Sequence, residues 1–199
     1  MNEYMNEAKK ANLENESKYF VENLEALTNE LQKITGKGYT MQMMTDTYYF
    51  SESMPKNSTL RIREVNGVYT PTLKIPIYDN KGLKKRLELE SLEEISLNLG
   101  INLANINDID YFFKKQLVIK QERNIIEYLG VEFSVDNVFY YNLNNELFYS
   151  AKIFEAELKS QQGTITRNGV LKHVKDKKLI KNPCTLDKYK LGLKNMSKI

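Results

Sequence analysis

The chain has 199 residues, of which 41% are hydrophobic and 28% charged, with a formal net charge of +3 and a pI near 8.7. This composition is typical of a soluble globular domain, and the charge alone is too small to indicate nucleic-acid binding. The single cysteine, Cys184, excludes an intrachain disulfide and favours a reducing compartment, so we expect a cytoplasmic protein.

The N-terminal residues 1–11 carry acids and no apolar run, so we expect a polar leader rather than a signal peptide. No apolar segment approaches the roughly 20 residues that a membrane helix needs, so no membrane partner is expected. Residues 12–199 are long enough to bury one core. We therefore predict a single domain over residues 12–199.

The first predicted elements are a strand and a helix. Residues 12–21 alternate in polarity, which places Glu14, Glu16 and Lys18 on one face of a strand. Between residues 24 and 34, leucine and isoleucine recur at helical spacing, and Gly36 ends that pattern. This segment is a short amphipathic helix.

Four strands are expected next, over residues 41–53, 58–65, 69–77 and 83–91. The second of them places Arg61 and Arg63 on one face, and Asn66-Gly67 is typical of a hairpin turn into the third. Pro71 and Pro76 lie within the third strand, and we expect them to bend or fray it. The charged faces of the last two strands carry Lys74, then Lys84, Arg86, Glu88 and Glu90.

The second half of the chain also contains segments with helical spacing and segments with strand alternation. Residues 91–113 have helical spacing with breaks near Gly100 and Asn107, and residues 116–128, 131–141 and 151–159 are predicted strands. A basic segment over 165–181 is predicted to be helical, and "TLDKYKLGL" closes the chain. About eight strands and few helices predict an antiparallel α+β fold, either a sandwich or a barrel.

Like charges are paired on the polar faces of these strands. Glu-x-Glu occurs at 14/16, 88/90 and 155/157, and Arg-x-Arg occurs at 61/63. On any single strand such a face ordinarily meets water, but paired like charges on several strands cost energy unless something neutralises them. Carboxylates on different strands suit a divalent cation, and rows of arginine and lysine suit phosphate oxygens. A barrel with these faces inside would need helices over its apolar exterior, and the segments near 22–35, 91–113 and 165–181 are candidates.

The order of the motifs resembles the CYTH superfamily, also called triphosphate tunnel metalloenzymes. The motifs are "ENESK", "DTYYF", "LRIRE", "TLK", "RLELE", an arginine-bearing strand, "SVDNV", "FEAELKS" and the tail "DKYKLGL", over about residues 12 to 193. The resemblance implies an eight-stranded antiparallel β-tunnel, a closed barrel with a charged lumen that holds a triphosphate. Members include inorganic triphosphatases, thiamine triphosphatases, class IV adenylyl cyclases and fungal-type RNA triphosphatases.

The resemblance also implies site residues, position by position. The expected ligands of Mg²⁺ or Mn²⁺ are Glu14, Glu16, Glu88, Glu90, Asp136, Glu155 and Glu157, with Glu14, Glu16, Glu155 and Glu157 expected to be catalytic. The expected phosphate-binding residues are Lys18, Arg61, Arg63, Lys74, Arg86 and Arg123.

Two positions depart from the family pattern. Phe50 and Ser51 follow the tyrosine pair where members usually carry an acid, so that acid is missing or Asp46 or Glu52 takes its role. Lys120 and Arg123 differ in parity, so both would face the lumen only if a bulge intervened.

These residues predict metal-dependent hydrolysis of a small triphosphate, with inorganic triphosphate as first choice. The alternatives are a class IV-type adenylyl cyclase that makes cyclic AMP and pyrophosphate, a thiamine triphosphatase (disfavoured because the chain has no tryptophan), a non-enzymatic sensor of polyphosphate or nucleotide, and a purely structural role. Cys184 and His173 are expected to be bystanders. A homodimer, the preferred metal ion and a plug formed by residues 165–181 stay open, and no nucleic-acid partner is expected.

Overall fold

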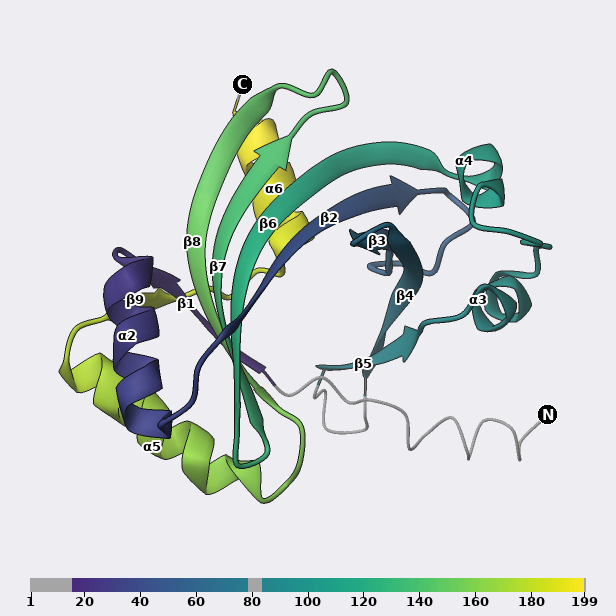
Figure 1. The fold of residues 1–199 in the computed structure, drawn as a ribbon. Helices are drawn as coiled ribbons and strands as arrows, with labels where there is room; N and C mark the ends of the chain where they lie inside the picture. The colour runs from purple at the N-terminus through teal and green to yellow at the C-terminus, as the bar shows by residue number, and fades with distance from the viewer. Residues whose placement is uncertain (1–15, 79–83, 199) are drawn as a thin grey trace. The chain divides into compact units, whose positions relative to one another are not determined.

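The computed structural model describes residues 16–78 and 84–198 of this antiparallel α+β protein (Figure 1). The chain divides into two compact units, one within Asp46–Leu117 and the other formed by Asn15–Thr45 and Val118–Ile199. Two long strands, β2 (Thr40–Phe50) and β6 (Lys114–Tyr128), contribute residues to both units. The predicted fold class is confirmed, while the single domain over residues 12–199 stays a prediction.

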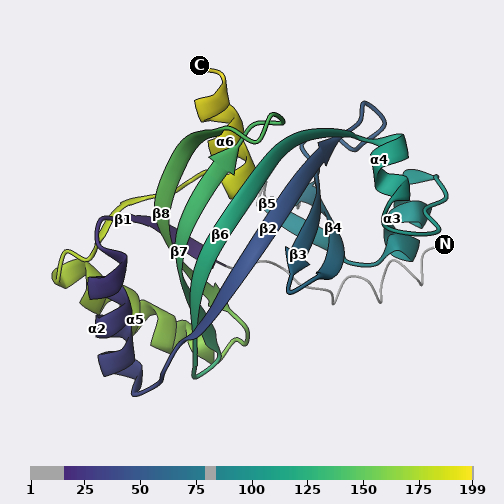
Figure 2. The same ribbon diagram turned by 45° about the horizontal axis from the view of Figure 1, so that its top comes forward.

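The Asp46–Leu117 unit contains a sheet in the order β5-β4-β3-β2, formed with β3 (Thr59–Val65), β4 (Val68–Tyr78) and β5 (Lys84–Leu89) (Figure 2). The predicted Asn66-Gly67 turn joins β3 to β4, and Val65 pairs directly with Val68. Both turn residues have positive φ, 52° and 78°, which is the conformation that an asparagine-glycine hairpin turn provides. The turn therefore sets the register of β3 against β4.

The two prolines of β4, which were expected to bend or fray it, do not interrupt the strand, which runs continuously over Val68–Tyr78. Pro71 pairs with Ile62 of β3 and has no partner in β5, because β5 pairs only with residues 73–78. Pro76 pairs with Arg86 of β5 beyond the last residue that pairs with β3. A proline lacks the N–H that a second neighbour would need, so each occupies a stretch with one neighbour.

The apolar face of this sheet is covered by α3 (Leu92–Leu99) and α4 (Asp108–Phe112). Helix α3 starts with the predicted change to helical spacing, at a capping box in which Ser91 Oγ accepts from the Glu94 N–H at 3.1 Å. The helices and the sheet share one buried cluster, which consists of Tyr49, Leu60, Leu73, Leu89, Ile95, Leu103, Ile109 and Phe113. Because strands alternate, this packing leaves the charged side chains of β2 to β5 on the opposite face.

The other unit contains a sheet in the order β2-β6-β7-β8-β1-β9. Its strands include β1 (Glu16–Val21), β7 (Val131–Tyr141), β8 (Leu147–Leu158) and β9 (Ile180–Pro183). Strand β8 starts earlier than the predicted residue 151. Strand β9 was not predicted, since residues 165–181 were expected to be helical throughout, and it brings the described strands to nine rather than eight.

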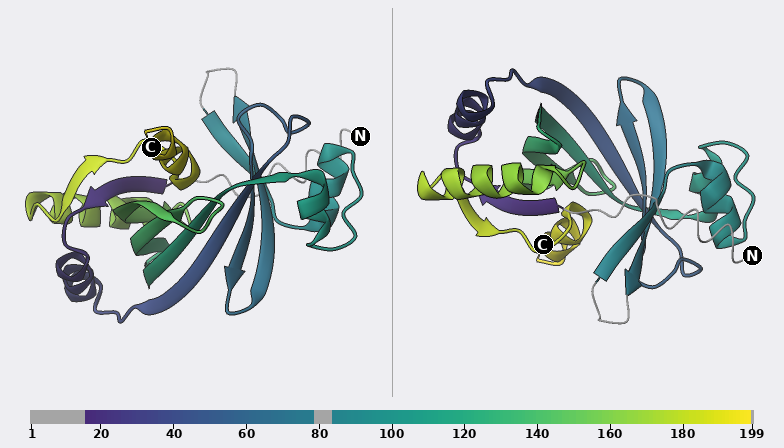
Figure 3. Two further views of the ribbon diagram at one scale, coloured as in Figure 1. Left: turned by 90° about the horizontal axis from the view of Figure 1, so that it is seen from above. Right: turned by 90° about the horizontal axis from the view of Figure 1, so that it is seen from below.

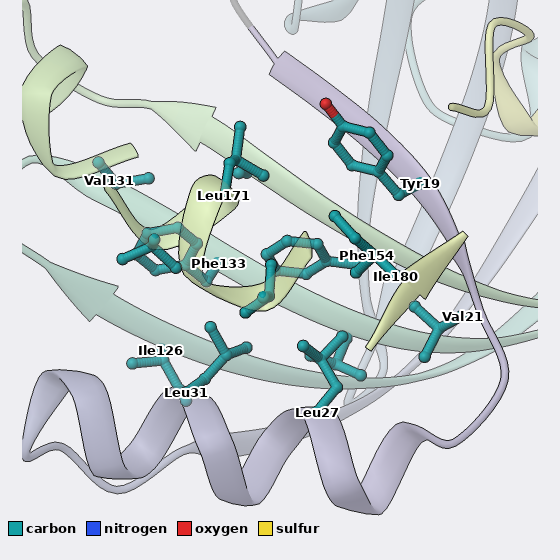
Figure 4. Close-up of a cluster of buried hydrophobic side chains, with 14 residues drawn as sticks. Tyr19, Val21, Leu27, Leu31, Ile126, Val131, Phe133, Phe154, Leu171 and Ile180 are labelled. Carbon is teal, nitrogen blue, oxygen red and sulfur yellow. The ribbon is translucent and has the colours of Figure 1, made fainter. Parts of the chain in front are cut away.

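Helices α2 (Leu24–Thr35) and α5 (Gly163–Asp176) pack against β7 and β8 and against each other, with α6 (Lys188–Met196) lying apart from them (Figure 3). They bury the side chains that β7 and β8 direct to this face, including Phe133 and Phe154, which stack with ring centroids 6.1 Å apart (Figure 4). Leu27 and Leu31 of α2 are fully buried in the same cluster. The prediction that helices cover the apolar face is confirmed here. The basic segment predicted over residues 165–181, most of which forms α5, therefore covers this apolar face.

Helix α6 (Lys188–Met196) contacts β8. Asp187 caps it, since a carboxylate oxygen accepts from the Lys190 N–H at 2.8 Å. The first helical residue, Lys188, is buried against charged side chains of β7 and β8. No helix in the described part of the chain is long and apolar enough to cross a bilayer.

Candidate functional site

Each unit carries one cluster of charged side chains on the face opposite its apolar core. We call them the arginine cluster, which consists of Asp46, Arg61, Arg63, Lys74 and Glu88, and the carboxylate cluster, which consists of Glu16, Lys18, Arg123, Asp136, Glu155 and Lys188. Ion pairs of 2.5–3.6 Å link the carboxylate cluster, and the arginine cluster contains ion pairs of 2.7–3.5 Å.

The centre of the carboxylate cluster is a two-pronged pair between neighbouring strands. Arg123 of β6 pairs in register with Asp136 of β7, and its Nε and Nη2 donate to the two carboxylate oxygens at 2.8 and 2.7 Å. The same Nη2 donates to Glu155 of β8 at 2.7 Å. Asp136 has no exposed surface and Glu155 is 7% exposed, so both charges depend on these partners.

Lys188 is a functional-site candidate that sequence reasoning missed. Its ammonium donates to Asp136 at 2.5 Å and to Glu155 at 3.2 Å. The tail motif "DKYKLGL" contained this lysine and was matched to the family, but nothing in the local sequence indicates which strand a tail helix will meet. From β1, Lys18 lies 2.5 Å from Glu16 and 3.6 Å from Glu155. Three cations thus surround the Asp136 and Glu155 carboxylates.

These contacts shift the ionisation of the cluster. Burial alone raises the pKa of Glu155, but Lys188, Lys18 and Arg123 outweigh it and hold that pKa well below its usual range. Burial and the nearby Arg123 lower the pKa of Lys188, although Asp136 and Glu155 act in the opposite direction. The carboxylate of Glu155 is therefore ionised at neutral pH.

A row of glutamates lies beside this cluster. Glu157 of β8 is directly opposite Glu16 of β1 on one side and Glu132 of β7 on the other. Glu127 of β6 continues the row opposite Glu132. Lys159 lies 2.9 Å from Glu157 and 3.2 Å from Glu132. Sequence reasoning found Glu16 and Glu157 but missed Glu132 and Glu127, since their alignment requires the strand register.

The donor chemistry of this region fits a hard divalent cation, because carboxylate oxygens are the ligands that Mg²⁺ and Mn²⁺ take. Within residues 16–78 and 84–198, however, no three histidine, cysteine, aspartate or glutamate side chains are grouped for a metal ion. Glu14, one of the predicted ligands, lies outside the described residues. Glu16 and Glu157 are the predicted ligands that the register places directly opposite each other.

The arginine cluster is organised around a buried carboxylate. Asp46 of β2 has no exposed surface, and its two oxygens accept from Nε and Nη2 of Arg63, both at 2.7 Å. Arg61 Nη1 lies 3.5 Å from the same carboxylate, and Arg61 Nη2 is 3.4 Å from the Thr72 hydroxyl. The structure thus brings together the two arginines of β3 that were predicted to bind phosphate, with an aspartate underneath them.

The predicted residues of β4 and β5 extend this cluster in part. Lys74 pairs in register with Glu88, and the two side chains form an ion pair of 2.7 Å. Glu90 follows the end of β5 and is exposed, with its N–H donating to Glu94. Arg86 pairs through its backbone with Pro76, and its side chain lies outside the described part of the chain.

Other side chains that the sequence singled out lie away from both clusters. No register shift separates Lys120 from Arg123 on β6, so Lys120 faces the other side, where its ammonium lies 4.7 Å from the Tyr141 ring centroid. His173 is half-exposed and lies 2.7 Å from Glu30 of α2. Burial raises the pKa of the Cys184 thiol, which keeps it protonated.

A hollow of about 470 Å³ lies between α5 and β1, on the apolar side of the sheet rather than on the charged face. Its lining includes Ser17, Tyr19, Asn168 and Lys172, and none of the predicted site residues. This hollow and the predicted site residues therefore do not coincide.

Comparison with known proteins is consistent with the motifs. No curated protein sequence matches the chain. An adenylate cyclase candidate from Bacillus halodurans is 18% identical with a TM-score of 0.59, and the match covers 89% of this chain and 96% of that chain. A similar protein from Hippeastrum is described as an adenylyl cyclase candidate with a dominant triphosphatase activity. It is 14% identical with a TM-score of 0.60, and the match covers 92% of this chain and 96% of that chain.

A protein from Pyrococcus horikoshii OT3 is 18% identical with a TM-score of 0.54, and the match covers 85% of this chain and 94% of that chain. At such identities, similarity to solved structures shows the fold alone. The family model described as the CYTH domain matches residues 12–172, which is most of the chain. The chain belongs to the CYTH domain family.

Proposed function

We propose that this protein is a metal-dependent hydrolase of triphosphates, with inorganic triphosphate as its preferred substrate. The observation that carries the proposal is the arginine cluster, in which Arg61, Arg63 and Lys74 lie on the charged face of one sheet. Guanidinium and ammonium groups so placed bind the oxygens of a polyphosphate. Family membership supports the same substrate class, because CYTH members include triphosphatases.

The chain's own residues have distinct parts in this proposal. Arg61, Arg63 and Lys74 bind phosphate oxygens and offset the charge that develops on the transferred group and on the leaving pyrophosphate. Glu16 and Glu157, with Glu14, hold Mg²⁺ or Mn²⁺. When bound, such an ion neutralises phosphate charge and orients water. In the tunnel expected for the family, a triphosphate meets basic and acidic side chains, and this chain carries both kinds on the charged faces of its sheets.

The alternative function, a non-enzymatic sensor that only binds polyphosphate, is tested by a variant of the carboxylates. A protein that only binds polyphosphate would not need the carboxylates, so Glu157→Gln separates the two functions. We expect it to reduce orthophosphate release at least a hundredfold, roughly the loss of one essential group in phosphoryl transfer, while triphosphate binding in chelator persists. Glu122→Gln is the matched control, since Glu122 is exposed on the other face of β6.

Normal turnover by Glu157→Gln would overturn the assignment of this carboxylate.

An adenylyl cyclase is retained as the second candidate function because the similar proteins from Bacillus halodurans and Hippeastrum carry that description. It predicts cyclic AMP and pyrophosphate from ATP instead of orthophosphate. The cytoplasmic location and a homodimer also stay predictions.

A further inference from the structure

We propose that Asp46 is a positioning residue that orients Arg61 and Arg63 for phosphate. This inference rests on the proposed function, which assigns the two arginines to phosphate binding. From the sequence, Asp46 was one of two residues expected to take the role of the acid that is missing after the tyrosine pair. Its geometry supports a different role, through the arginines rather than on substrate or metal.

Asp46 accepts from several guanidinium donors at once. Both of its oxygens accept from Arg63, in the two-pronged arrangement that fixes the plane of a guanidinium. Arg61 Nη1 approaches the same carboxylate at 3.5 Å. One aspartate on β2 thus restrains the two long side chains of β3, which otherwise have many rotamers to lose on binding a ligand.

The Asp46 carboxylate is more deeply buried than the two arginines that it contacts. Asp46 has no exposed side-chain surface, whereas 14% of the Arg61 side chain and 23% of the Arg63 side chain are exposed. The guanidinium groups therefore lie between the carboxylate and the open side of the sheet. A phosphate arriving on that side meets the arginines first.

The pairing with Asp46 leaves other guanidinium donors available to a ligand. A guanidinium has five N–H donors, and the pair with Asp46 uses the Nε–Nη2 edge of Arg63, which leaves Nη1 for another acceptor. Arg61 Nε is buried and has no hydrogen-bond partner among the described residues. A buried donor of this kind is costly until an acceptor reaches it, and a phosphate oxygen is a suitable acceptor.

Two roles for Asp46 predict opposite effects of Asp46→Asn. If the carboxylate merely competes with phosphate for the arginines, removing its charge strengthens binding of a polyanion. If it positions them, the loss of the charged acceptor frees the guanidinium groups and weakens binding. The sign of the change therefore decides between competition and positioning.

The experiment measures binding of inorganic triphosphate in chelator by titration calorimetry. We expect Asp46→Asn to weaken binding roughly tenfold or more, as for loss of a hydrogen-bonded charged partner. Glu93→Gln is the matched control, because it removes the same charge from an exposed site of the same unit and should change affinity less than about twofold. Unchanged or tighter binding by Asp46→Asn would overturn the proposal.

A double-mutant cycle with Arg63→Lys tests whether the effect passes through Arg63, since lysine cannot form the two-pronged pair. We expect Asp46→Asn to cost clearly less in the Arg63→Lys background, and full additivity would contradict positioning. If Asp46→Asn does not fold, Asp46→Glu keeps the charge but displaces it. This variant should fold and bind triphosphate more weakly than the wild type, and wild-type affinity would contradict the proposal.

A further measurement separates this inference from the proposed function. In nitrogen-15 NMR spectra we expect a slowly exchanging Arg63 Nε–H signal in the wild type that is lost in Asp46→Asn. If the wild-type chain binds no triphosphate, the proposed function fails, and this signal still decides whether Asp46 orders Arg63. An Arg63 signal that is unchanged by Asp46→Asn would overturn the inference.

Discussion

Arg123 and Asp136 face each other across β6 and β7 and form two parallel hydrogen bonds of 2.8 and 2.7 Å. Lys188, the first residue of helix α6, also donates a hydrogen bond to Asp136. Arg123 was expected to bind phosphate, and that role stays a prediction. The guanidinium already serves two buried carboxylates, so it contributes to the stability of this unit whether or not it meets a ligand.

Asp136→Asn tests that contribution. The substitution removes one of the two buried carboxylates that Arg123 and Lys188 share, and breaking such a pair costs about 3–5 kcal/mol. We expect a loss of this size in the free energy of unfolding, measured by urea denaturation. Asp176→Asn, at an exposed site of the same unit, should change it by less than about 0.5 kcal/mol. Equal effects of the two variants would contradict the assignment.

Lys188→Met tests the ionisation of Glu155. Because the pKa of Glu155 is lowered in the folded state, its carboxylate stabilises the fold above the unfolded pKa and loses this effect as pH falls. Without the Lys188 ammonium the folded pKa rises, so acid unfolding should begin at higher pH. The exposed Lys194→Met in the same helix is the control. Acid-unfolding midpoints that coincide in the two variants would show that Lys188 does not act on Glu155.

Glu30 of α2 provides a second pH dependence. Hydrogen bonds from Lys177, just after α5, and from His173 of α5 are the main causes that lower the pKa of Glu30 from 4.5 to about 2. The linkage stabilises the fold above pH 4.5 and disappears as pH falls towards 2. In thermal melts, Glu30→Gln should therefore lower Tm at pH 6 but not at pH 2. A Tm difference that is constant over this range would contradict the pairing.

The close approach of Gly130 and Gly163 gives a prediction that is independent of charge. A Cβ on Gly163, at the start of α5, would lie 2.4 Å from the Gly130 carbonyl oxygen, whereas a Cβ on Gly169 meets nothing within 4 Å. Gly163→Ala should thus lower the free energy of unfolding by about 1–3 kcal/mol because a backbone must move. Gly169→Ala in the same helix should raise it by up to about 1 kcal/mol. Urea denaturation of both variants distinguishes these signs.

Local patterns predicted most of the elements correctly. The alternation of Phe154 and Ala156 with Glu155 and Glu157 assigns both faces of β8, and Asn66-Gly67 assigns the β3–β4 turn. Strand β9 escaped prediction because its four residues have no periodicity of their own and pair with β1, far away in sequence. The continuity of β4 through its prolines was not foreseen for a similar reason, since it depends on where the neighbouring strands end.

The candidate site was predicted at the level of residue types but not of partners. Arg61 and Arg63 share a strand, so their common face follows from spacing alone. The position of Asp46 beneath them depends on how β2 lies beside β3, and Lys188 reaches the carboxylates only once α6 is placed against β8. Partners of this kind are set by tertiary packing, which a single sequence does not display.

The most direct test of the proposed activity is release of products from inorganic triphosphate, ATP, GTP and thiamine triphosphate, each with Mg²⁺, with Mn²⁺ and with chelator. We expect orthophosphate release that is fastest from inorganic triphosphate and is abolished by chelator. Cyclic AMP and pyrophosphate from ATP would favour the cyclase instead. Absence of turnover on every substrate, together with thermal stabilisation by triphosphate, would contradict the proposed hydrolase and indicate a binding protein.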